Sequence, residues 1–168
     1  MLRKILPLLN NRIPFRGFTI IAVMEITISS IDDLQRVVDV IQQLIAKDIR
    51  IFLLSGDLGA GKTALVKAFC ERVNAAEPAS SPTFSLVNAY SAPSLGTIFH
   101  MDLYRLSREQ DLDQIGFEEY IDSGNVCFIE WPALGFPRIA SPYCEILIEA
   151  GQNNYRIFNI TTHDTMDA

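Results

Sequence analysis

The segment GDLGAGKT at Gly56–Thr63 constrains the fold of this 168-residue chain more than any other feature. It matches the pattern G-x-x-x-x-G-K-[S/T], in which glycines allow a tight loop whose backbone N–H groups surround an anion. The apolar run Ile51–Leu54 before it is typical of a buried strand, and Lys62–Val73 after it is typical of a helix. This order predicts a loop that binds phosphate groups at the start of a helix.

Helix and strand patterns alternate through the rest of the chain. Ser30–Lys47 has apolar residues at helical spacing, and Arg108–Ser123 predicts one or two short helices. Further strands are expected at Thr83–Tyr90, Thr97–Asp102, Val126–Glu130, Tyr143–Glu149 and Tyr155–Thr161, with the first two forming a β-hairpin. We therefore expect an α/β fold of three layers, of the type found in P-loop NTPases, with a mostly parallel central sheet and a β-hairpin.

The formal net charge of −6 is spread unevenly along the chain. Residues 1–24 hold four basic residues and no acid, so residues 25–168 carry −10, which is −6 minus +4. We expect residues 1–24 to be a basic N-terminal extension that is disordered or precedes the native start at Met24, with a targeting segment as the alternative. Residues 25–168 are expected to form a single domain.

Composition excludes several classes of partner. The acidic body argues against a general binder of DNA or RNA, which needs a basic face. The apolar run Ile20–Met24 is among the longest in the chain and falls far short of the ~20 residues that span a bilayer, so no membrane partner is expected. Three cysteines without C-x-x-C spacing predict buried thiols in a reducing, cytoplasmic location, and only two histidines make a zinc site improbable.

Two acidic residues, Asp102 and Glu130, end strand patterns and are candidates for binding a metal or water. Mg²⁺ on a nucleotide takes an oxygen ligand from the loop, here the Thr63 hydroxyl, and commonly needs a carboxylate at the end of a neighbouring strand. Spacing alone leaves open which acid holds the metal and which orients water. His100 is expected to pack in the core or the hairpin. Because the chain has no N-K-x-D motif for reading guanine, ATP is the expected nucleotide, with ADP as its product.

Four motifs occur in a characteristic order. They are GDLGAGKT at Gly56–Thr63, S-P-T-F at Ser81–Phe84, H-M-D-L-Y-R at His100–Arg105 and E-W at Glu130–Trp131. Together they resemble the TsaE (YjeE) family, the small bacterial ATPases of tRNA threonylcarbamoyladenosine biosynthesis. The resemblance implies ATP or ADP and Mg²⁺ as cofactors, and slow hydrolysis by the free protein. It also implies action through the TsaB–TsaD protein pair, with tRNA contacted indirectly through these partners.

The resemblance further implies roles for individual residues. Lys62, Asp102 and Glu130 are expected to be catalytic: Lys62 contacts phosphates and Asp102 is needed for hydrolysis. Thr63 and Glu130 are expected to hold Mg²⁺, and Thr83 belongs to a switch-like loop beside the γ-phosphate. The expected nucleotide-binding residues are Gly56, Asp57, Leu58, Gly59, Ala60, Gly61, Lys62, Thr63, Ala64, Thr83 and Trp131.

Two other functions share a phosphate-binding loop. A small-molecule or nucleotide kinase normally carries arginines on a lid, whereas the arginines here are scattered along the chain. A binding module gated by nucleotide without useful turnover is the third hypothesis. A phosphorylated product would favour the kinase, and full support of repeated reaction cycles by a nonhydrolysable ATP analogue would favour the binding module.

Overall fold

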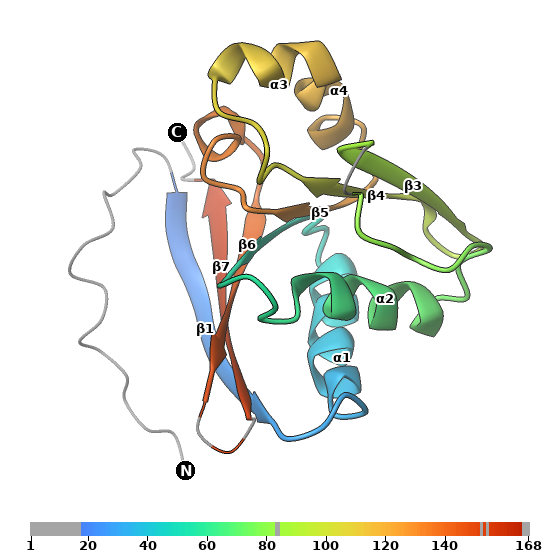
Figure 1. Cartoon of the computed structure of the whole chain (residues 1–168), viewed down its shortest axis with the longest axis vertical. Helices are drawn as coiled ribbons and strands as arrows, with labels where there is room; N and C mark the ends of the chain where they lie inside the picture. The colour runs from blue at the N-terminus through green and yellow to red at the C-terminus, as the bar shows by residue number, and fades with distance from the viewer. Residues whose placement is uncertain (1–17, 83–84, 152, 154, 166–168) are drawn as a thin grey trace.

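The computed structural model describes residues 18–82, 85–151, 153 and 155–165 (Figure 1). The strands are β1 (Phe18–Ile28), β2 (Ile51–Ser55), β3 (Val87–Ala92), β4 (Gly96–Asp102), β5 (Val126–Glu130), β6 (Tyr143–Ala150) and β7 (Arg156–Thr165). The helices are α1 (Leu34–Ile45), α2 (Lys62–Arg72), α3 (Glu109–Ile115), α4 (Phe117–Ile121) and the short 3-10 helix η1 (Phe136–Arg138). Seven strands form one sheet in the order β1-β7-β6-β2-β5-β4-β3.

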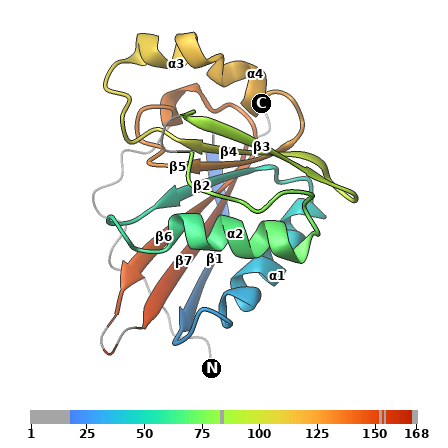
Figure 2. The same ribbon diagram turned by 45° about the vertical axis from the view of Figure 1, so that its right-hand side comes forward.

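Helices cover both faces of this sheet, as Figures 1 and 2 show. Side chains on successive strand residues point to opposite faces, so a central strand contributes side chains to the apolar layers on both faces of the sheet. In β2, Phe52 and Leu54 pack in the layer of α1 and α2, while Ile51 and Leu53 pack in the layer of α3 and α4. The three-layer α/β architecture expected from the sequence is therefore confirmed.

The sheet is mixed rather than mostly parallel as expected. The pairs β6–β2, β2–β5 and β5–β4 are parallel, whereas β1–β7, β7–β6 and β4–β3 are antiparallel. The physical reason lies in the connections: β3 and β4, like β6 and β7, are joined by short turns, and a short turn permits only antiparallel pairing. The β3–β4 pair is the predicted hairpin.

Strand β1 was not predicted from the sequence. It pairs with β7 along the outer edge of the sheet, from Phe18 opposite Thr165 to Ile28 opposite Arg156. The expected division at residue 24 falls within this strand, so residues 18–24 belong to the sheet. Residues 1–17 lie outside the described residues, and the boundary between extension and domain stays a prediction.

The parallel pairs bring three strand ends to one edge of the sheet. Leu54 at the end of β2 pairs with Glu130 at the end of β5, and Glu130 pairs with Asp102 at the end of β4. The chain leaves β2 at this same edge to enter the glycine-rich loop. Clefts at the carboxyl ends of parallel strands are the usual binding places of α/β sheets, so the fold directs the site here.

All three cysteines are buried and free, as the sequence indicated. Burial raises the pKa of the Cys70 thiol to about 11 and that of Cys127 to about 12. Both thiols therefore stay protonated at neutral pH and act as small apolar core groups. Across the residues that the structure describes, no helix is long and apolar enough to cross a membrane.

Truncation of β1 tests how much of the strand the domain needs. Among the β1 side chains that are described, only Ile26 and Ile28 are buried. A chain that begins at Met24 is expected to fold, whereas one that begins at Ser29 should lose about 3–6 kcal/mol of unfolding free energy, since each buried isoleucine contributes about 1.5–3 kcal/mol. Urea unfolding of both chains measures this, and equal stabilities would contradict it.

Candidate functional site

The glycine-rich loop between β2 and α2 has a backbone that only glycine fits at its first position. Gly56 has a φ of 141°, and a Cβ on it would lie 2.3 Å from the carbonyl oxygen of Ile148 on β6. Gly61, which precedes α2, has a φ of 116°. Both angles lie where L side chains are strained, so these glycines let the loop fold back over the sheet edge and enter the helix.

Lys62, the first residue of α2, is folded back onto the loop. Its Nζ donates to the carbonyl oxygens of Gly56 at 2.7 Å and Asp57 at 2.9 Å, and it lies 4.0 Å from the centre of the Trp131 ring. The side chain is only 4% exposed. Burial lowers the pKa of Lys62, and the negative charges of nearby carboxylates, Glu130 foremost, act against this shift. An anion in the loop would offer this ammonium a stronger partner than two neutral carbonyls.

Glu130 joins the helix to the sheet. Its Oε1 accepts a hydrogen bond from the Thr63 hydroxyl at 2.7 Å and lies 2.9 Å from Nε2 of His100. Glu130 is 3% exposed, and His100 is fully buried. His100 thus packs in the core as expected, and it also contacts a carboxylate, a role that the sequence did not reveal.

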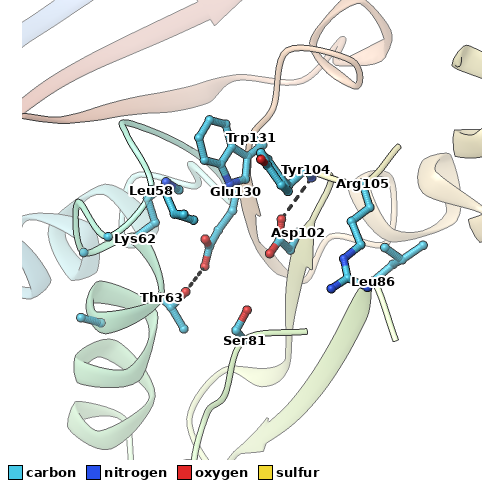
Figure 3. A pocket seen from close by; sticks show the side chains of 13 residues that line it. Leu58, Lys62, Thr63, Ser81, Leu86, Asp102, Tyr104, Arg105, Glu130 and Trp131 are labelled. Atoms are coloured by element: carbon cyan, nitrogen blue, oxygen red, sulfur yellow. Dashed lines mark hydrogen bonds between the residues drawn. The ribbon is translucent and has the colours of Figure 1, made fainter. Parts of the chain in front are cut away.

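Asp102 lies beside Glu130 at the end of β4 and is half-buried. Its Oδ1 accepts the backbone N–H of Tyr104 at 3.1 Å, which fixes the carboxylate in a local turn (Figure 3). The Tyr104 ring stacks at a tilt against Trp131, with 4.9 Å between the ring centres. Aromatic side chains therefore form one wall of the space beside the two carboxylates.

These groups surround a cavity of about 400 Å³. Figure 3 shows the loop and helix side chains on one side of it and those from the strand ends on the other. Its lining comprises Leu58, Gly59, Gly61, Lys62, Thr63, Ala64, Ser81, Leu86, Asp102, Tyr104, Arg105, Glu130 and Trp131. Two of the lining residues have strained backbones, because Leu86 and Trp131 adopt φ values of 61° and 56°. Such strain in non-glycine residues is concentrated at functional sites.

The cavity brings together most of the residues predicted from the sequence. Leu58, Gly59, Gly61, Lys62, Thr63, Ala64, Asp102, Glu130 and Trp131 all line it. Gly56 and Asp57 do not line it but accept hydrogen bonds from Lys62. Ala60 is buried and lines a neighbouring cavity of about 240 Å³, together with Arg156. Thr83 lies outside the described residues.

Four lining residues were not among the predicted ones: Ser81, Leu86, Tyr104 and Arg105. Three of them belong to motifs that the sequence displays, S-P-T-F and H-M-D-L-Y-R, so motif membership was the available signal. Leu86 belongs to none of these motifs. It lines the cavity because its backbone is left-handed, which the sequence does not reveal.

The oxygen atoms of the cavity suit a hard cation. A hydroxyl and a carboxylate, from Thr63 and Glu130, stand 2.7 Å apart on its wall. Oxygen ligands of this kind fit Mg²⁺. Within the described ranges no group of three or more His, Cys, Asp and Glu side chains could hold a metal by itself. The site thus fits an ion that takes one or two protein ligands and completes its shell with phosphate and water.

Fold and site together define an α/β protein with a P-loop at the carboxyl edge of its sheet. The family model described as "Threonylcarbamoyl adenosine biosynthesis protein TsaE" matches residues 28–158. The chain therefore belongs to the TsaE family of tRNA threonylcarbamoyladenosine biosynthesis proteins, and the resemblance seen in the sequence is confirmed.

Individual relatives agree with this assignment. The tRNA threonylcarbamoyladenosine biosynthesis protein TsaE of Rickettsia conorii is 38% identical over 128 residues, covering 72% of this chain and 70% of the relative. The protein of the same name from Bacillus subtilis is 33% identical over 116 residues, covering 69% and 72%. The crystal structure of Bacillus subtilis YdiB superimposes with a TM-score of 0.64 over 86% of this chain and 87% of that one, at 22% identity, which supports the fold.

Two alanine substitutions in the loop test its backbone geometry. Gly56→Ala is expected to lower the free energy of unfolding by about 3 kcal/mol, because strain adds to a clash with the Ile148 carbonyl. Gly59→Ala should cost about 1 kcal/mol, since its φ is 77° but no described atom lies within 4 Å of a Cβ there. Chemical denaturation measures both, and a costlier Gly59→Ala would contradict the geometry.

Proposed function

We propose that this protein is the ATP-hydrolysing component of the machinery that forms N6-threonylcarbamoyladenosine at position 37 of tRNA, and that it acts through the TsaB–TsaD complex. The observation that carries the proposal is the convergence of Lys62, Thr63, Asp102 and Glu130 on one cavity in a chain of the TsaE family. Each of the four has a distinct task in cleaving a phosphoanhydride.

The loop and the start of α2 bind the polyphosphate of ATP or ADP. Free backbone N–H groups at a helix start and a positive helix end both attract phosphate. Lys62 leaves the Gly56 and Asp57 carbonyls and donates to phosphate oxygens, which are charged acceptors and bind an ammonium more strongly than neutral carbonyls do. Trp131, 4.0 Å from this ammonium, closes the other side of the lysine.

Thr63 and Glu130 would hold Mg²⁺ at the cavity wall. The ion, when bound, neutralises charge on the phosphate oxygens during transfer. Asp102 acts on the attacking water: one oxygen is fixed by the Tyr104 N–H, and the other is available to orient the water and accept its proton. Lys62 stabilises the charge that builds on the phosphoryl group, whose bond to ADP breaks as the bond to water forms.

Protein partners explain how an acidic chain serves tRNA chemistry. Two apolar side chains on the lining of the cavity are exposed, Leu58 at 84% and Tyr104 at 62%, and exposed apolar groups favour protein contacts. We propose that TsaB–TsaD docks here and completes the site, so that the free protein hydrolyses ATP slowly. We place this reaction in the cytoplasm, and the three free buried cysteines are consistent with that location.

Removal of the lysine ammonium or the Asp102 carboxylate tests the catalytic assignment. In a reconstituted system containing TsaB–TsaD and tRNA, Lys62→Ala and Asp102→Asn are each expected to reduce ADP release and threonylcarbamoyladenosine formation by about 100-fold or more. Lys67→Ala, an exposed lysine on the same helix, is the matched control and should behave like the unmodified protein.

Three outcomes would contradict the proposed function. Threonylcarbamoyladenosine formation that survives both substitutions removes the ATPase role. ADP release accompanied by a phosphorylated small molecule or nucleotide indicates a kinase. Full activity over repeated cycles with a nonhydrolysable ATP analogue indicates a nucleotide-gated binding module.

Metal dependence tests the Thr63 hydroxyl separately. Chelation with EDTA should abolish hydrolysis, and added Mg²⁺ should restore it. Thr63→Val keeps the shape of the side chain but removes the oxygen, so the Mg²⁺ concentration for half-maximal hydrolysis is expected to rise about 10–100-fold. Thr97→Val, at the far end of β4, serves as the control. An unchanged Mg²⁺ requirement in Thr63→Val would exclude this hydroxyl as a ligand.

A further inference from the structure

We propose that His100 is a positioning residue that holds the Glu130 carboxylate against Thr63 through an Nε2–H hydrogen bond. The inference rests on the proposed function, because the task of Glu130 as a metal ligand belongs to it. His100 itself does not line the cavity, so its effect on the reaction passes through Glu130.

The register of two parallel strands places the ring beside the carboxylate. His100 on β4 pairs with Phe128 on β5, and Asp102 pairs with Glu130, so His100 stands two residues before the level of Glu130. Ile98 and Phe128 pack in the layer of α2, and strand alternation puts His100 and Glu130 on that same face. The resulting distance from Nε2 to Oε1 is 2.9 Å, a full hydrogen bond.

Burial makes this hydrogen bond consequential. Glu130 is 3% exposed, and a buried carboxylate without donors is strongly destabilising. Among the described residues, its Oε1 accepts a hydrogen bond from the Thr63 hydroxyl and lies within hydrogen-bond distance of the His100 ring. Thr63 lies at the start of α2, next to the loop from which Lys62 would turn to phosphate in the proposed function, whereas His100 lies within the sheet. The ring therefore keeps the Glu130 carboxylate in place while the Thr63 hydroxyl binds Mg²⁺.

The surroundings of the ring assign its tautomer. Nδ1 of His100 is buried and has no hydrogen-bond partner among the residues that the structure describes. A neutral ring protonated at Nε2 donates to Glu130 and leaves only a lone pair at Nδ1. The other tautomer would bury an unpaired N–H and set two lone pairs against each other between Nε2 and Oε1, which is unfavourable. The Nε2–H tautomer is thus the form that positions Glu130.

Two substitutions separate the donor from the bulk of the ring. His100→Phe retains an aromatic ring without a donor, and the Mg²⁺ concentration for half-maximal hydrolysis should rise about 10–100-fold, the usual effect of losing a partner of a metal ligand. His100→Gln offers an N–H at nearly the position of Nε2 and should recover most of the loss. In neither variant should nucleotide affinity without Mg²⁺ change, because His100 lies away from the phosphate-binding loop.

Ile98→Ala is the matched control on the same strand. Ile98 is fully buried in the α2 layer and does not line the cavity, so its loss should lower stability while leaving the Mg²⁺ requirement unchanged. A rise in the Mg²⁺ requirement equal to that of His100→Phe would show that destabilised packing alone accounts for the effect and would overturn the proposal.

The ring tautomer gives a readout independent of activity and of any variant. Nitrogen NMR of the unmodified protein, labelled with ¹⁵N in histidine, should show His100 protonated at Nε2 and unprotonated at Nδ1. The opposite tautomer would overturn the proposal, as would an unchanged Mg²⁺ requirement in His100→Phe. Failure of Lys62→Ala to affect activity would instead contradict the proposed function, and the NMR result would still decide the contact between His100 and Glu130.

Discussion

The buried carboxylate of Glu130 is the contact on which the site depends. One oxygen atom accepts a hydrogen bond from the first turn of α2 and lies within hydrogen-bond distance of the ring on β4, while the residue itself ends β5. A buried charge must find such partners, because its desolvation otherwise costs several kcal/mol. The need to satisfy Glu130 therefore fixes the start of α2, and with it the glycine-rich loop, against two strand ends.

The sheet supplies the geometry for that contact. Two parallel pairs, β2–β5 and β5–β4, align the carboxyl ends of these three strands, whereas antiparallel pairs extend the sheet on either side. Gly56 completes the arrangement, because only a residue without Cβ allows the loop to pass the Ile148 carbonyl. Backbone dipoles and one lysine thus gather at a single edge of an acidic chain, where a polyanion would meet favourable partners.

Local patterns in the sequence predicted the features that depend on local chemistry. The loop, Lys62 and the α/β architecture follow from motif and periodicity. Strand β1 was missed because several of its apolar residues, such as Val23, are exposed, and pairing with β7 forms across most of the chain length. The contact of His100 with Glu130 depends on strand register, which alternation of residues within one strand does not reveal.

A crystal structure with a nonhydrolysable ATP analogue and Mg²⁺ tests the central claim most directly. The account predicts phosphates within the loop at residues 56–61, Lys62 Nζ moved from the loop carbonyls to phosphate oxygens, and the metal on the Thr63 hydroxyl. Glu130 should keep its contact with His100 in that structure. The account is contradicted if the analogue binds away from the loop, or if Lys62 stays on the Gly56 and Asp57 carbonyls while the metal is bound elsewhere.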